Sequence, residues 1–235
     1  MTVAGGPALK AERLVRADEA VLVVDEGPRF VSRGGEKLDA AVARFGLADE
    51  IAGARVLDAG ASTGGFTDCL LQHGAATVLA VDVGYGQLHE KLRADARVEV
   101  HDRTNVRELK AGDLGEPVDM VVADLSFISL RSVLPSLLGL AKPGAEMVFL
   151  VKPQFEASRT DAARGQGVIR DPAVWRDVLY DIRDALAHHG AAIMGAMVSP
   201  LHGADGNVEF LVHARATPGA AQIDVEQLLV EAGSG

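Results

Sequence analysis

Apolar segments that alternate with helix-like stretches are the feature that most restricts what this chain can fold into. We expect five strands in its first two thirds, at residues 55–58, 78–82, 98–100, 118–124 and 147–152. Strands that are apolar throughout and separated by helices favour a mostly parallel sheet with helices on both faces. Two later strands, near 193–198 and 208–212, complete a predicted α/β fold of Rossmann-like type with a seven-stranded sheet.

Helix signals lie between these strands. Gly74 follows a helix predicted at about 65–73, in the position that a left-handed residue takes after a helix. Asp171 caps a longer helix predicted at about 172–189, whose first residue is proline. A further helical stretch is expected at 130–140.

Four of the predicted strands end in an ionisable residue, which is poor material for a core. These residues are Asp58, Asp82, Asp124 and Lys152. In open α/β sheets, ligands bind beside the carboxyl ends of the strands. The four side chains are therefore candidate functional residues. Asp102, which follows the third strand, stands where a carboxylate could bind the amino group of an adenine ring.

Composition narrows the functional classes. The formal net charge of −10 argues against nucleic-acid binding unless a basic surface is local, because Lys and Arg neutralise phosphate groups. The single cysteine, Cys69, excludes an internal disulfide and favours a reducing compartment. The sequence predicts neither a signal peptide nor a membrane-spanning segment. We therefore expect a soluble, cytoplasmic protein.

The turn after the first strand of the sheet, Asp58 to Phe66, is rich in glycine. Glycine residues allow positive φ and a close approach of ligand to backbone. Asp82 follows Gly60 by 22 residues, a spacing that suits a carboxylate accepting the ribose hydroxyls of a nucleoside cofactor. Ser62 takes the second glycine position of the dinucleotide fingerprint, which disfavours a nicotinamide cofactor.

S-adenosylmethionine suits this turn better, because Asp58 would attract its ammonium and sulfonium groups. We expect its ribose at Asp82 and its methionine part along Gly60, Ser62, Thr63, Gly65 and Phe66. A tight strand-to-helix turn with no ligand is the simplest alternative, and the three strand-end carboxylates disfavour it.

The same turn also matches G-x-S-x-G, the nucleophile elbow of serine hydrolases. In that fold several strands precede the elbow, whereas here it would follow the first strand of the sheet. His202 or His213 would have to complete a triad with Ser62. The serine hydrolase is therefore the weaker interpretation.

Several sequence blocks, in a fixed order, resemble one protein family. They are S-R-G-G-E-K-L at 32–38, S-T-G-G-F-T-D-C-L-L at 62–71, V-D-V-G-Y-G-Q-L at 81–88, R-T-N at 103–105, D-L-S-F-I-S-L at 124–130, K-P-Q-F-E at 152–156, S-P at 199–200 and G-N-V-E-F-L at 206–211. Over about residues 28 to 214 the chain resembles the TlyA family of ribosomal RNA 2′-O-methyltransferases, often named haemolysins. The resemblance implies a class I methyltransferase fold of the FtsJ-like kind.

The resemblance also implies a domain organisation. The family begins with a compact RNA-binding module, and residues 1–30 resemble only its last strand, Ala20 to Val24, and a linker. Residues 31–216 correspond to the FtsJ-like methyltransferase domain, and 217–235 to a tail with a short helix. RNA affinity and target choice are the properties that a shortened module would affect.

FtsJ-like enzymes use a Lys-Asp-Lys-Glu set, which the resemblance carries onto Lys37, Asp124, Lys152 and Glu209. A ribose hydroxyl is a weak nucleophile that must lose its proton, and Lys152 is the expected base. A lysine is normally protonated at neutral pH, so a nearby sulfonium and a second lysine would favour the neutral amine. Asp124 would orient Lys152 and also touch the cofactor, while Lys37 and Glu209 would position the hydroxyl.

The expected partners are therefore S-adenosylmethionine and ribosomal RNA or ribosomal subunits, with no metal and no membrane. Four arginines that follow the fifth strand either contact RNA phosphates or form a solvated loop and helix face: Arg159, Arg164, Arg170 and Arg176. Two alternatives stay open: a membrane-active, haemolysin-like protein, and an inactive methyltransferase fold that lacks its RNA-binding module.

Overall fold

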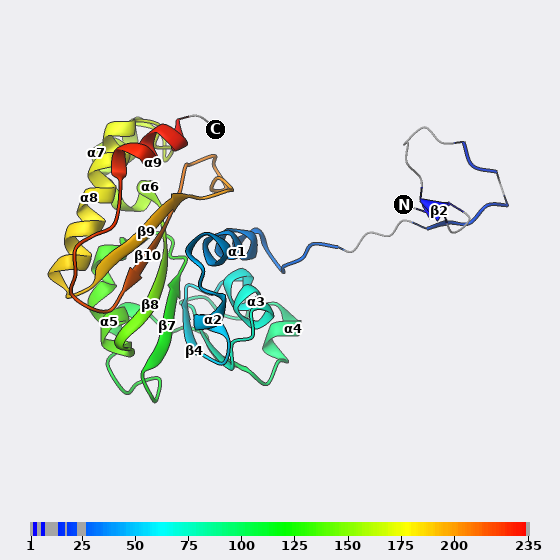
Figure 1. The fold of residues 1–235 in the computed structure, drawn as a ribbon, viewed down its shortest axis with the longest axis horizontal. Coiled ribbons are helices and arrows are strands. Elements are labelled where there is room, and N and C mark those ends of the chain that lie inside the picture. The colour runs from blue at the N-terminus through cyan, green and yellow to red at the C-terminus, as the bar shows by residue number, and fades with distance from the viewer. Residues whose placement is uncertain (1, 4–5, 8–13, 17, 23–26, 234–235) are drawn as a thin grey trace.

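The computed structural model describes the chain apart from residues 1, 4–5, 8–13, 17, 23–26 and 234–235 (Figure 1). Its main feature is a seven-stranded sheet with the strand order β6-β5-β4-β7-β8-β10-β9. These strands are β4 (Arg55–Ala59), β5 (Thr77–Val81), β6 (Val98–His101), β7 (Val118–Ala123), β8 (Ala141–Val151), β9 (Ala192–Val198) and β10 (Phe210–Arg215). The strand order changes direction between β4 and β7, the place where open α/β sheets bind ligands.

Most of the sheet is parallel. The five strands β4 to β8 run parallel to one another, and β10 runs antiparallel to both of its neighbours, β8 and β9. The prediction of a mostly parallel, seven-stranded Rossmann-like sheet is confirmed. Strand β8 begins at Ala141 and not at the predicted residue 147. The sequence did not predict this extension because Lys142 to Gly144 are exposed and break the apolar pattern.

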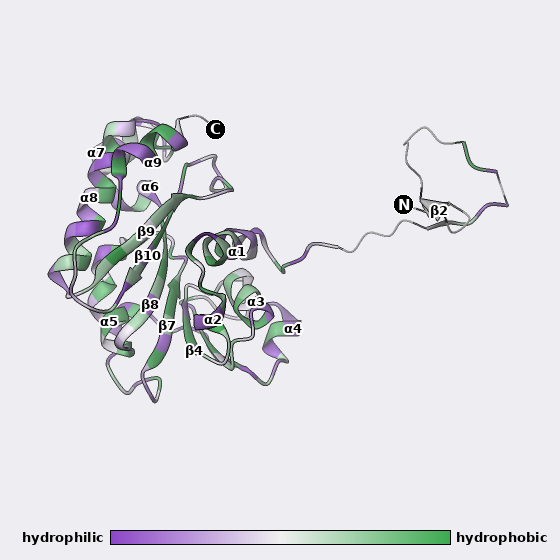
Figure 2. Ribbon diagram, in the orientation of Figure 1, coloured by the Kyte–Doolittle hydropathy of each residue, from purple (hydrophilic) through white to green (hydrophobic). Residues whose placement is uncertain are grey.

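Helices cover both faces of the sheet (Figure 1). One apolar cluster holds α1 (Arg33–Phe45), α2 (Ala48–Ile51), α3 (Gly65–Gln72) and α4 (Glu90–Arg93), and the other holds α5 (Leu134–Leu140), α8 (Pro172–His188) and α9 (Val225–Ala232). Neighbouring strand residues alternate between the clusters, as Val56 and Leu57 do. Figure 2 shows apolar strands inside and hydrophilic outer helix faces.

The helices begin and end largely where the sequence predicts. Helix α3 is followed by Gly74 with φ +87°. The Asp171 carboxylate accepts a hydrogen bond from the backbone N–H of Ala173 and so caps α8. The helix predicted at 130–140 is divided into a 3-10 turn (Leu130–Ser132) and α5. The first turn of α5, like that of α8, contains a proline.

The two flanking regions contain small elements. Near the N-terminus, β1 (Thr2–Val3), β2 (Gly6–Pro7) and β3 (Val21–Leu22) form a separate antiparallel sheet in the order β2-β1-β3. Residues 23–24 of the strand predicted at 20–24 lie outside the described residues. Helix α9, in the predicted tail, packs on the α8 side of the sheet. Within the described residues, every helix is too short or too polar to cross a membrane.

Candidate active site

The glycine-rich turn between β4 and α3 lies directly against the end of β7. Gly60 has φ +85°, and a Cβ on it would lie 2.5 Å from the backbone oxygen of Asp124. No larger residue fits there without moving β7. The backbone N–H of Ser62, itself at φ +48°, donates to Asp82 Oδ2 at 2.9 Å. The turn is therefore held between the carboxyl ends of β5 and β7.

A cavity of 550 Å³ opens beside this turn. Asp82, Asp124 and Asn105 supply polar groups to its lining, while Val106 and Ile128 supply apolar surface. The Asp82 carboxylate, which also accepts from the Gly84 N–H at 2.7 Å, is fixed by two backbone donors. A nucleoside fits such a lining, because its ribose needs acceptors and its base needs an apolar slot. We call this space the cofactor cavity.

Asp58 lies under the turn, fully buried in β4. Thr67 Oγ1 donates to its Oδ2 at 2.6 Å, whereas Oδ1 has no hydrogen-bond partner within the described part of the chain. Burial raises the pKa of Asp58 to about 7, and the nearby Asp124 charge acts in the same direction. Its attraction for a cofactor ammonium stays a prediction.

Asp102 takes a different position from the other strand-end acids. Its carboxylate binds Arg93 Nη2 at 3.0 Å and accepts from the Gly86 N–H at 3.3 Å. It lies outside the lining of the cofactor cavity, where Asn105 and Thr104 stand instead. Its contact with an adenine amino group remains a prediction.

A second cavity of 370 Å³ adjoins the first, and Gly60, Ser62, Asp124 and Ser126 line both. We call it the acceptor cavity. It is also lined by Thr63, Gly65, Phe66, Lys37, Lys152, Ser32, Arg33 and Gly34. All five turn residues predicted to hold the methionine part of the cofactor thus line at least one of the two cavities.

Lys152 directly follows β8 and lines the acceptor cavity. Its Nζ lies 2.6 Å from Asp124 Oδ1 and donates to Ser126 Oγ at 2.9 Å. The backbone places the two charged groups together because β7 and β8 are parallel neighbours whose carboxyl ends lie side by side. An amine so held has a fixed direction into the acceptor cavity, which is what proton transfer requires.

Lys37 and Glu209 form the second charged pair. Lys37 Nζ lies 2.5 Å from Glu209 Oε2, and both side chains are about nine-tenths buried. Lys37 comes from α1 and Glu209 from the residue before β10, 172 positions later. Helix α1 reaches this place because it packs tightly on α3: a Cβ on Gly65 would lie 2.3 Å from Ser32 Oγ.

Two buried residues that the sequence analysis did not single out support the site. Asn207 accepts from the Ile169 N–H and donates to the Gly167 carbonyl, both at 2.9 Å, and so ties the segment after α7 (Arg159–Arg164) to the loop before Glu209. Glu156, in α6 (Pro153–Glu156), accepts from the Leu130 N–H and from Ser129 Oγ. Both stand inside the sequence blocks quoted above, which is the signal that could have found them.

The hydrolase interpretation gains no support from this geometry. Ser62 Oγ lies 3.3 Å from Gln87 Oε1, and no hydrogen bond joins it to a histidine in the part of the chain described. His213 binds the buried Glu146 carboxylate at 2.6 Å and lines a separate cavity near the end of α1. Arg176 is ion-paired with Glu226, which makes it part of a solvated helix surface.

Comparison with known proteins gives a consistent result. Residues 30–216 match the model of the family described as FtsJ-like methyltransferase. Over 212 residues the chain is 48% identical to the 16S/23S rRNA (cytidine-2′-O)-methyltransferase TlyA of Mycobacterium tuberculosis, covering 90% of this chain and 78% of that one.

Solved structures agree on the fold. A crystal structure described as a candidate hemolysin of Lactococcus lactis superposes with a TM-score of 0.83 at 41% identity, covering 87% of this chain and 99% of that one. Magnesium protoporphyrin IX methyltransferase of Synechocystis, solved with bound SAM, matches at a TM-score of 0.53 and 16% identity over 78% of this chain and 79% of that one. The second likeness concerns the fold alone.

Proposed function

The chain belongs to the FtsJ-like methyltransferase family, and on that premise we propose that it transfers a methyl group from S-adenosylmethionine to a ribose 2′-hydroxyl of ribosomal RNA. The observation that carries this proposal is the meeting of two Lys–carboxylate pairs beside the glycine-rich turn. Their four residues come from separate segments of the sequence, and the fold brings three of them into the lining of one cavity.

The cofactor cavity suits S-adenosylmethionine. Asp82 would hold the ribose, and the apolar side chains of Val106 and Ile128 would enclose the adenine. Asp124, which lines both cavities, faces the region between the nucleoside and the acceptor. The cofactor supplies an activated methyl group, and the two Lys–carboxylate pairs prepare the ribose oxygen that receives it.

Lys152 acts as the base for the ribose hydroxyl. Asp124 and Ser126 fix its Nζ, so the amine accepts the hydroxyl proton in a defined direction. The Lys37–Glu209 pair closes the acceptor cavity from the α1 side and positions the ribose through Lys37, which lines the cavity. Each lysine lies beside its own carboxylate, and Lys152 accepts the hydroxyl proton in its neutral amine form.

The same geometry bears on the two alternatives. An inactive fold would be free to lose these pairs, whereas both are in hydrogen-bonding distance and the Lys37–Glu209 pair is buried, a costly arrangement to keep without use. The hemolysin name belongs to structural relatives. Among the described residues of this chain, no helix is long and apolar enough to span a membrane.

The proposal is tested by two measurements on the full chain. Calorimetric titration should detect S-adenosylmethionine binding that Asp82→Ala abolishes. Transfer of radiolabelled methyl to unmethylated ribosomal RNA should fall by about 10²- to 10⁴-fold in Lys152→Ala, with cofactor affinity intact. A folded protein that does not bind the cofactor contradicts the proposal, and so does full transfer activity in Lys152→Ala.

A further inference from the structure

One cation in the acceptor cavity has no counter-ion. Arg33 is the first residue of α1, is exposed, and lines the cavity together with Lys37 and Lys152. Lys37 is neutralised by Glu209 and Lys152 by Asp124. Within the described residues, Arg33 has neither an ion-pair nor a hydrogen-bond partner for its side chain. The cavity therefore carries one uncompensated positive charge.

Cations without an ion pair are the minority among the described residues of this acidic chain. Most described Lys and Arg side chains contact a carboxylate: Arg16, Arg29, Lys37, Arg55, Lys91, Arg93, Arg97, Arg131, Lys142, Lys152, Arg164, Arg176, Arg183 and Arg215. With ten more acidic than basic residues, a free guanidinium at a functional cavity stands out against this pattern. Acidic side chains were available to neutralise it, and none does so in the described structure.

We propose that Arg33 binds a backbone phosphate of the RNA next to the ribose that is methylated. This inference rests on the proposed function and adds to it a substrate-binding residue. A guanidinium binds phosphate through two parallel N–H···O bonds, which fixes orientation as well as position. Arg33 and Lys37 lie four residues apart and so share one face of α1, which places phosphate and ribose contacts on a single rigid element.

RNA is the source of the anion that the arrangement favours. The carboxylate of the cofactor is the other anion that could reach the cavity, through the glycine-rich turn. That turn presents backbone N–H groups of its own, and the first turn of α3 follows it directly, which are the usual donors for such a carboxylate. Arg33 instead comes from α1, one helical turn before the lysine that positions the ribose.

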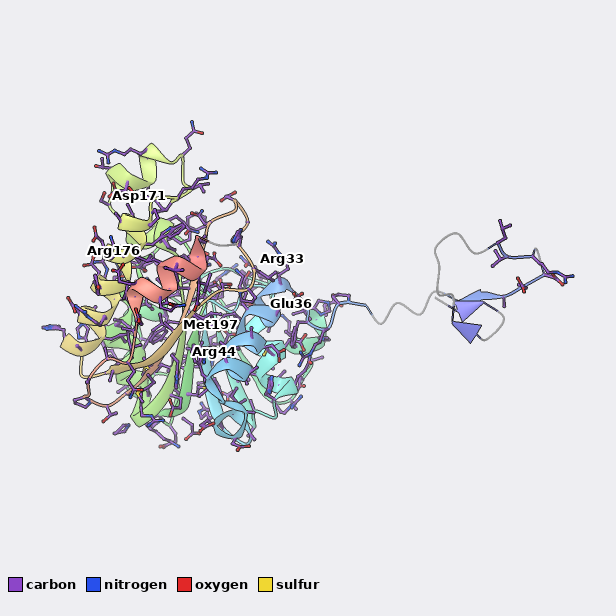
Figure 3. All side chains as sticks on the ribbon, turned by 45° about the horizontal axis from the view of Figure 1, so that its top comes forward. Arg33, Glu36, Arg44, Asp171, Arg176 and Met197 are labelled. Atoms are coloured by element: carbon purple, nitrogen blue, oxygen red, sulfur yellow. The ribbon has the colours of Figure 1, made fainter. Side chains whose placement is uncertain are left out.

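The chain offers a matched control on the same helix. Arg44 is also exposed and also lacks an ion pair in the described structure, and it lies about 16 Å from Arg33 along α1 (Figure 3). It lines a different cavity, near His213. Arg33→Ala and Arg44→Ala thus remove the same charge from the same element, at and away from the acceptor cavity.

The test measures binding of unmethylated ribosomal RNA by filter retention at several salt concentrations, and binding of S-adenosylmethionine by calorimetry. Arg33→Ala should weaken RNA binding by about tenfold and lower the log–log salt slope by about 0.7 to 0.9, the value for one phosphate. Arg33→Lys should recover part of the affinity, because it keeps the charge but loses the two-pronged geometry. Cofactor affinity and the RNA affinity of Arg44→Ala should stay at the wild-type values.

Each other result overturns the inference in a distinct way. Equal losses in Arg33→Ala and Arg44→Ala would mean that only overall charge matters. Weaker cofactor binding with normal RNA binding in Arg33→Ala would assign the guanidinium to the cofactor carboxylate. A wild-type protein that binds cofactor but neither binds nor methylates RNA overturns the proposed function and Arg33's role together, whereas normal RNA binding by Arg33→Ala overturns only the latter.

Discussion

At the scale of single residues, the buried acid beneath the cofactor turn has a measurable energetic signature. Asp58 has a pKa raised from 3.8 to about 7, chiefly by burial. The folded state therefore holds its proton more tightly than the unfolded state, and the free energy of unfolding falls as pH rises from about 4 to 7. Above pH 7 the full penalty applies, at most about 4 kcal/mol.

Replacing Asp58 by Asn removes this charge with little change of shape. We expect Asp58→Asn to be more stable than the wild type at pH 8 by about 1 to 4 kcal/mol, and equal to it near pH 4, in urea unfolding. Asp119 is the control of opposite sign, because Lys142 and the Arg55 N–H hold its pKa below the usual range. A pH-independent difference for Asp58→Asn would refute the assignment of a buried, shifted carboxyl.

Phe127 is the most exposed large apolar side chain on the cofactor cavity. It is 92% exposed and has φ +63°, a strained conformation for a bulky residue, and its ring lies 5.1 Å from that of Phe155. A ring held outward at a nucleic-acid site suits base stacking, worth about 1–3 kcal/mol. Phe127→Ala should raise the KM for RNA about tenfold and leave the melting temperature unchanged; an unchanged KM would exclude stacking.

At the scale of elements, the segment between α7 and α8 depends on one side chain. Asn207 is buried and holds it by hydrogen bonds to Ile169 and Gly167. Asn207→Ala leaves both backbone groups without partners and should cost about 1–3 kcal/mol. Hydrogen exchange should quicken at residues 165–169, while Asn207→Asp, which keeps the acceptor, should protect the Ile169 N–H. Equal exchange rates at residues 165–169 in the two variants would contradict this role.

Some residues of the candidate site could be predicted from the sequence alone and others could not, for physical reasons. Asp82, Asp124 and Lys152 could be found because each ends an apolar run, and a run's end is a local signal. Lys37 and Glu209 required the family resemblance, because their pairing depends on β10 entering the sheet between β8 and β9. The partner of Asp102 could not be foreseen, since Arg93 reaches it from a different element.

At the scale of the whole molecule, the net charge of −10 is compatible with RNA binding because several cations without an ion pair belong to the acceptor cavity or to segments near the carboxyl edge of the sheet. Arg33 lines the acceptor cavity, Arg103 and Arg107 follow β6 at the carboxyl edge of the sheet, and Arg170 follows the segment tied to Asn207. Arg103 also lies 4.3 Å from the centroid of the exposed Tyr85 ring. A basic surface can therefore exist on an acidic protein.

These four cations set the expected salt dependence. If each meets one phosphate, the slope of log affinity against log salt should be about −3, from 0.7 to 0.9 per phosphate. Filter retention between 50 and 200 mM salt measures it. A slope near zero would mean that the described cations do not meet the RNA backbone, and a slope far steeper than −3 would require contacts from other residues.

The pairing of Lys37 with Glu209 also affects when the site can form during synthesis of the chain. Synthesis proceeds from the N-terminus, so Lys37 emerges from the ribosome 172 residues before its partner. Glu209 is placed only when β10, the last strand along the chain, inserts between two strands made earlier. A nascent chain therefore has the cofactor turn long before the four proposed catalytic residues can come together, and the proposed site is complete only after β10 has been made.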